Sequence, residues 1–162
     1  MKAGGRTAAL AVTLAMLVGC AGPRVSGGRS EIGEIHLFGV PVALNLDSRP
    51  GPDGIGVRVF MTPAGRARGT EMREGRLDVL MFDGVVTAAD FTRTPPLKVW
   101  SFNARQLAPV VGSSALGIGY QLALNWEQNR PHVTSVTVVA RYHPPSGPDL
   151  FSTPNSISVG TR

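Results

Sequence analysis

Apolar and polar residues alternate with a period of two in several short stretches of this chain. In residues 40–46, for example, Val40, Val42, Leu44 and Leu46 alternate with small or polar residues. This alternation predicts a strand with one buried face and one exposed face. The same pattern predicts six more strands, over residues 57–61, 77–82, 97–102, 120–126, 133–142 and 156–159.

Turn and helix signals separate these stretches. Asp83-Gly84 is a turn dipeptide, and the chain contains 20 glycines and 13 prolines, a composition that favours turns over long helices. Asn103 followed by Gln106 matches a capping box and predicts a short helix over residues 104–108. Residues 85–95 are ambiguous, and residues 87–91 within them can form one helical turn. The expected fold class is all-β: an antiparallel two-sheet sandwich of about seven strands with one short helix, either immunoglobulin-like or transthyretin-like.

The N-terminus has the pattern of an export signal. Lys2 and Arg6 precede an apolar stretch over residues 8–18, which is too short to span a bilayer core as a helix because that needs about 20 residues. The stretch ends in Leu17-Val18-Gly19-Cys20, which contains the only cysteine. These four residues resemble the lipobox of bacterial lipoproteins. The resemblance implies signal cleavage between Gly19 and Cys20 and acyl chains on Cys20; an ordinary secretory signal with a chance cysteine is the alternative.

This interpretation divides the chain into three parts. Residues 1–19 are expected to be the lipoprotein signal peptide, residues 20–34 the lipidated cysteine with a flexible tether, and residues 35–162 the β-sandwich domain. In the enterobacterial sorting pattern of lipoproteins, an Asp after the cysteine retains the protein at the inner membrane. Ala21 occupies that place, so the resemblance implies an outer-membrane anchor facing the periplasm.

Charge gives little support to nucleic-acid binding. Without residues 1–19 the chain has 14 basic and 11 acidic residues, a net charge of +3. The densest basic group is interrupted by acidic residues and has no aromatic residues among it; its members are Arg66, Arg68, Arg73 and Arg76. A solvated face is expected there, with contact to anionic lipid or polysaccharide as the alternative.

The residues that usually carry catalysis or bind zinc do not form a motif. His36, His132 and His143 lack the spacing of a zinc site. Each lies beside a predicted strand end or turn, where an exposed histidine is expected. Ser113 and Ser114 have no partner base marked nearby and are not in a nucleophile elbow. We therefore expect no catalytic, cofactor-binding or metal-binding residue and no enzymatic activity.

Two further groups of residues have alternative interpretations. Asp47 and Asp53 can form part of a calcium site, although turn chemistry is the favoured explanation for Asp beside Gly and Pro. Trp100, Trp126 and Tyr120 can form a sugar-stacking platform if they face solvent, although their strand positions favour packing in the core.

Two resemblances concern the mature domain. Leu97-Lys-Val-Trp-Ser-Phe, Leu116-Gly-Ile-Gly-Tyr and Val138-Val-Ala-Arg-Tyr resemble a family of uncharacterised lipoproteins of planctomycete-type bacteria, which implies no activity. Leu44-Asn45-Leu46-Asp47, Arg49-Pro50 and Val57-Arg58-Val59-Phe60 resemble the first strands of the outer-membrane lipoprotein of type VI secretion systems. The second resemblance implies a transthyretin-like sandwich that binds an inner-membrane protein through a loop.

The function expected from the sequence is that of a lipid-anchored β-sandwich of the cell envelope with a structural or protein-binding role. Its partners are expected to be the membrane, through the acyl chains on Cys20, and an unidentified envelope protein. A secretion-system lipoprotein subunit and a carbohydrate-binding envelope module are the two alternatives.

Overall fold

The computed structural model describes residues 32–90 and 93–160. The expected signal peptide, Cys20 and most of the expected tether lie outside the described residues. The expected helical turn over residues 87–91 lies partly outside them; in its described part, the Asp90 amide donates to the Thr87 carbonyl at 3.0 Å.

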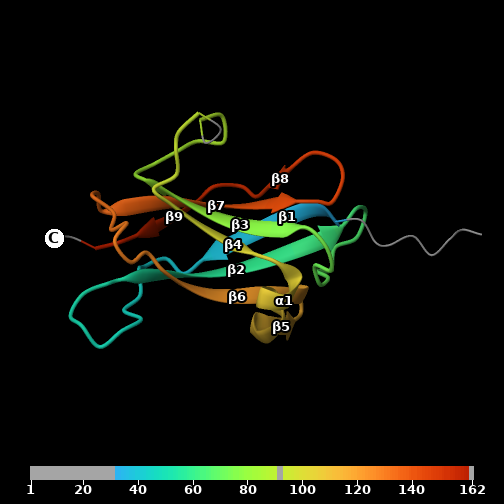
Figure 1. Ribbon diagram of the computed structural model, residues 1–162, viewed down its shortest axis with the longest axis horizontal. Coiled ribbons are helices and arrows are strands. Elements are labelled where there is room, and N and C mark those ends of the chain that lie inside the picture. Colours follow the sequence, from blue (N-terminus) through green and yellow to red (C-terminus); the bar gives the residue numbers. More distant parts are fainter. Residues whose placement is uncertain (1–31, 91–92, 161–162) are drawn as a thin grey trace, which may run out of the picture.

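The described residues form nine strands in two antiparallel sheets, which we call sheet A and sheet B (Figure 1). Sheet A has the order β1-β2-β6-β5, with bounds Ile32–Gly39, Gly54–Pro63, Gly117–Asn125 and Val111–Ser114. Sheet B has the order β4-β3-β7, with bounds Lys98–Phe102, Arg76–Asp83 and Ser135–His143. β8 (Leu150–Phe151) and β9 (Asn155–Ser158) both pair with β7. The expected all-β, two-sheet sandwich is confirmed.

The core lies between the sheets and takes alternate residues from each strand. A strand points successive side chains to opposite faces, so the apolar alternation of the sequence becomes one inward face per sheet. Sheet A contributes Ile35 and Leu37, Val57, Val59 and Met61, and Tyr120, Leu122 and Leu124. Sheet B contributes Leu77, Val79 and Met81, and Val136, Val138 and Ala140. Burying each of the larger side chains contributes about 1.5–3 kcal/mol.

A short helical segment joins the edge strands of the two sheets. α1 (Ala104–Leu107) follows β4, and the 3-10 turn η1 (Ala108–Val110) leads into β5. The expected capping box is present: Asn103 Oδ1 accepts from the Gln106 amide at 3.1 Å, and Gln106 Oε1 accepts from the Asn103 amide at 2.9 Å. Leu107 is fully buried in the core, so this connection closes one side of the sandwich.

Residues 40–46 do not form the strand that their alternation predicts. Pro41 cannot donate a ladder bond, and the segment crosses between the sheets instead. The Val40 amide donates to the Gly56 carbonyl of β2 at 2.9 Å, whereas the Ala43 amide donates to the Ser158 carbonyl of β9 at 2.7 Å. Its valines at positions 40 and 42 therefore stay exposed.

Three strands were not expected from the sequence. β1 begins at Ile32, before the expected start of the domain at residue 35, and its buried Ile35 and Leu37 alternate with Glu34 and His36. β5 and β8 have only four and two residues. Strands of that length show too few periods of alternation for the pattern to identify them.

Tyr120 ties the loop before β3 to sheet A. Its ring is buried in the core, and its hydroxyl accepts a hydrogen bond of 2.6 Å from the buried Met72 amide. Burial raises the pKa of the Tyr120 phenol, only partly offset by the bond from Met72, so the hydroxyl stays neutral at ordinary pH.

Replacing Tyr120 with Phe keeps the ring and removes this acceptor. The Met72 amide is then buried without a partner, and we expect the free energy of unfolding to fall by about 1–3 kcal/mol. Urea denaturation of both proteins measures the difference. An unchanged midpoint would show that the bond does not hold the loop.

Candidate functional site

The densest polar cluster surrounds Asp78 on the outer face of sheet B. Asp78 is only 1% exposed. Its Oδ1 accepts from Ser101 Oγ at 2.7 Å and from Arg76 Nε at 3.1 Å. Its Oδ2 lies 2.7 Å from both Arg141 Nη2 and His143 Nε2. Each carboxylate oxygen is therefore held by two neighbouring groups.

These contacts determine the charge state of Asp78. Burial alone would raise its pKa, but hydrogen bonds from Ser101, Arg141 and His143, together with the charge of Arg76, outweigh burial and hold the pKa below the ordinary value. The cluster joins β3, β4 and β7. Since both oxygens of the carboxylate are occupied, we interpret it as a network that holds sheet B together.

The structure places the three histidines in different surroundings. His36 Nε2 lies 3.4 Å from Glu34 and His132 Nδ1 lies 2.9 Å from Asp83, with both imidazoles well exposed. The expected turn position is wrong for His36, which lies exposed within β1. The expectation of an exposed histidine is wrong for His143, which ends β7 and bridges Asp78 to Asp149 at 2.7 Å on each side. Sequence spacing could not reveal this bridge, because the contact with Asp78 comes from pairing with β3.

The two aspartates considered for calcium serve the loop between β1 and β2. Asp47 Oδ1 accepts from the Arg49 amide at 2.7 Å. Asp53 accepts from the Leu46 amide at 2.6 Å and from Asn125 Nδ2 at 2.9 Å. Across residues 32–90 and 93–160, no group of three or more His, Cys, Asp and Glu side chains is arranged to hold a metal ion.

The three aromatic residues considered for sugar stacking do not form an exposed platform. Tyr120 and Trp126 are buried in the core, and half-buried Trp100 packs against it. Trp100 Nε1 donates to the Asn125 carbonyl at 2.9 Å and so ties β4 to the end of β6.

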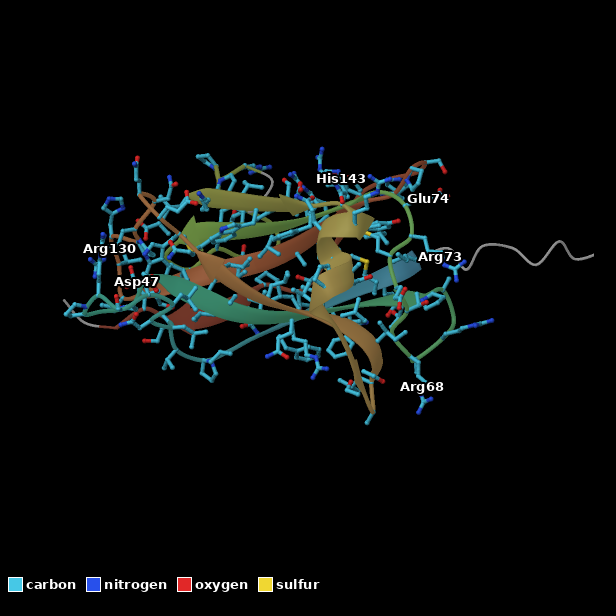
Figure 2. All side chains as sticks on the ribbon, turned by 60° about the horizontal axis from the view of Figure 1, so that its bottom comes forward. Asp47, Arg68, Arg73, Glu74, Arg130 and His143 are labelled. Atoms are coloured by element: carbon cyan, nitrogen blue, oxygen red, sulfur yellow. The ribbon has the colours of Figure 1, made fainter. Side chains whose placement is uncertain are left out.

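The basic group around residues 66–76 lies at one end of the sandwich. Figure 2 shows Arg68, Arg73 and Glu74 at this end and Asp47 and Arg130 at the other. Arg76 belongs to the Asp78 cluster. The remaining arginines are exposed beside acidic residues, in agreement with a solvated face.

A groove of about 670 Å³ lies over the outer face of sheet A. β1 and β5 are the edges of this sheet. The groove therefore has one wall at each edge of the sheet and a floor over β2 and β6. β1 and the following segment supply Phe38, Val40 and Leu44, and η1 and β5 supply Pro109, Val110 and Val111. Small residues of β2 and β6, Gly56 and Ala123, lie between them. We call this the sheet A groove.

One wall of the sheet A groove exposes large apolar side chains. Phe38 is 52% exposed and Val40 41%. Val111 of the opposite wall pairs with Tyr120, so its side chain points to the core face of sheet A and not to the outer face. Single apolar residues scattered over a protein surface are common, whereas a contiguous exposed apolar patch marks an interaction site. In the sequence, the only sign of this groove wall was the alternation at residues 40–46. Alternation identifies an apolar stripe, but it does not show whether the stripe is buried in the core or exposed in a groove.

The sheet A groove contains one charged side chain, Arg58 of β2. Its guanidinium carbon lies 5.1 Å from the centroid of the Phe60 ring, and Phe60 in turn meets Phe38 edge to face at 5.9 Å between centroids. Arg58 Nε is buried and has no hydrogen-bond partner in the described part of the chain. From the sequence, Arg58 was a position of the strand expected over residues 57–61 and part of a family resemblance, with no role assigned to it.

None of the helices within the described ranges has the length and apolar character that crossing a membrane requires.

We expect Asp78→Asn to lower the free energy of unfolding by about 3 kcal/mol at pH 7, because it leaves basic groups around a site that has lost its charge. The pKa of Asp78 is lower in the folded protein than the unfolded value of about 3.9. Its contribution to stability is therefore complete above pH 4 and is lost as the pH falls through the folded pKa.

Urea denaturation of both proteins between pH 7 and pH 2 tests this expectation. The gap between Asp78→Asn and the parent protein should narrow in acid. A gap that stays constant down to pH 2 would contradict the assignment.

No protein-family model, curated protein or solved structure matches this chain.

Proposed function

We propose that this protein is a lipid-anchored domain of the bacterial cell envelope that binds a partner protein through the sheet A groove. The observation that carries the proposal is the exposed apolar surface on the groove wall, formed by Phe38 and Val40. Water contact with such a surface is unfavourable, and covering it on binding contributes about 25 cal/mol for each Å² of apolar surface removed from water.

The shape of the groove favours a polypeptide ligand. Sites for small molecules enclose most of the surface of their ligand, whereas this groove lies open on the face of a sheet between two apolar walls. An extended segment can lie on such a face and place alternate side chains against the walls.

The sequence supports the anchor. Leu17-Val18-Gly19-Cys20 follows a short apolar stretch, and several acyl chains give a firmer hold than a single chain. The 12 residues 20–31 extend to at most about 40 Å, so the domain works close to the bilayer. With Ala21 after the cysteine, we propose the periplasmic face of an outer membrane and a binding role without catalysis.

A subunit of a secretion system is the second candidate. The residues that carry this resemblance include the loop between β1 and β2, and this loop has its own hydrogen bonds, with Asn45 Nδ2 donating to the Arg49 carbonyl at 2.7 Å and the Leu46 amide donating to Asp53. A loop held in this way is preorganised for a partner.

Cys20→Ser tests the anchor. We expect the parent protein to sediment with membranes and to need detergent for release, because its acyl chains are buried in lipid. The variant should remain in the soluble fraction of the same cells. A variant that still sediments with membranes and resists a salt wash would contradict lipid anchoring at Cys20.

Val40→Asp tests the groove, with Val85→Asp as its matched control. Val40 lies on the groove wall, whereas Val85 is 82% exposed outside the residues that line the groove. In pull-downs from detergent-solubilised envelopes, we expect the parent protein and Val85→Asp to recover the same protein and Val40→Asp to recover at least tenfold less. Equal recovery by the two variants would contradict a docking role for the groove.

A further inference from the structure

We propose that Arg58 binds a carboxylate carried by an extended apolar segment of the partner protein. This inference rests on the proposed function of the sheet A groove and names the chemistry that the groove recognises. It assigns Arg58 as the polar contact that determines which apolar segments bind.

The surroundings of Arg58 lack an anion. The residues that line the sheet A groove include no Asp or Glu. Elsewhere in the described residues, Lys98 lies 2.8 Å from Glu127, and Arg76 and Arg141 hold Asp78. For Arg58, no ion pair is formed within those residues, and its Nε is buried without an acceptor. A buried donor without a partner is unfavourable, and the guanidinium that carries it has no anion beside it to offset its charge.

The guanidinium is held in a position suited to a carboxylate. It lies over the ring of Phe60, which restricts its movement and leaves the planar fork of N–H donors available. A β-carbon at Gly112 would lie 3.4 Å from Arg58 Nη2, so the glycine leaves room beside the fork that a larger residue would narrow. Arginine and a carboxylate can form two parallel hydrogen bonds, and apolar surroundings strengthen their attraction.

The rest of the groove indicates that an apolar segment carries the carboxylate. Phe38 and Val40 offer apolar contacts on one wall, and the exposed Pro109 lines the other. One positive charge among apolar walls therefore matches a segment with one acidic group between apolar residues.

Panning of random 12-residue peptides on the immobilised intact protein tests this inference. We expect the parent protein to select apolar peptides that carry Asp, Glu or a free terminal carboxylate. Arg58→Gln should bind the selected peptides at least tenfold more weakly. Arg68→Gln serves as the matched control, since Arg68 lies in the exposed loop after β2 (Figure 2), and it should bind them as the parent does.

Urea denaturation distinguishes a binding role from a structural one. Arg58→Gln removes the contact with the Phe60 ring but no hydrogen bond or ion pair within the described residues, so its midpoint should stay close to that of the parent protein. A clearly lower midpoint for Arg58→Gln would show that the arginine supports the fold, and would overturn the inference.

The panning outcomes separate this inference from the function on which it rests. Selection of neutral apolar peptides that Val40→Asp no longer binds would support the groove and overturn the role of Arg58. Selection of no peptide, together with Arg58-dependent binding to vesicles of anionic phospholipid, would overturn both, because the groove would then be a lipid site.

Discussion

Alternate side chains of β2 and β6 meet those of β3 and β7 in the core, and the packing of these two faces holds the sandwich together. The chain has a single cysteine, so no disulfide within it reinforces this packing. The core uses one face of each sheet. The two outer faces of the sandwich differ. On sheet B the outer face is packed and paired within the fold, whereas on sheet A it carries the groove that we propose as the binding site.

The outer face of sheet B is largely satisfied within the fold. Val86 of the loop after β3 packs on Leu80, Phe82 and Val139 in a second apolar cluster, and its amide donates to Thr137 Oγ1 at 3.0 Å. Beside this cluster, Asp78 is held by two basic side chains, a hydroxyl and an imidazole. Apolar surface is covered there, and charge is paired.

On the outer face of sheet A, apolar surface is left exposed and a charge is left unpaired. Its apolar walls are exposed, and its one arginine in the groove has no anion beside it. The two buried polar side-chain atoms without a partner in the described residues, Arg58 Nε and Thr62 Oγ1, both belong to β2, and both residues point to this outer face. Of these two residues, only Arg58 lines the sheet A groove, so a partner bound there can contact Arg58 and not Thr62.

The sequence predicted the fold class, six of the nine strands and the capped helix, because each of these depends on local alternation or on a turn signal. The strand predicted over residues 40–46 is wrong. Alternation identifies an amphipathic stripe there, but it does not show whether the core, solvent or a partner covers that stripe. The sequence also missed the position of His143, which depends on the register between β7 and β3. The environment of Arg58 was equally hidden, since it arises from Phe60 two residues along β2 and from Gly112 on a different strand.

The most direct test of the central claim is photocrosslinking in cells that produce this protein, with a benzophenone amino acid at Phe38 or, as a control, at Val85. We expect a crosslink to one envelope protein from position 38, through an apolar peptide of that protein that carries a carboxylate, and no such crosslink from position 85. The absence of a protein crosslink at position 38, or the same product from both positions, would contradict the claim that the groove over sheet A binds a partner.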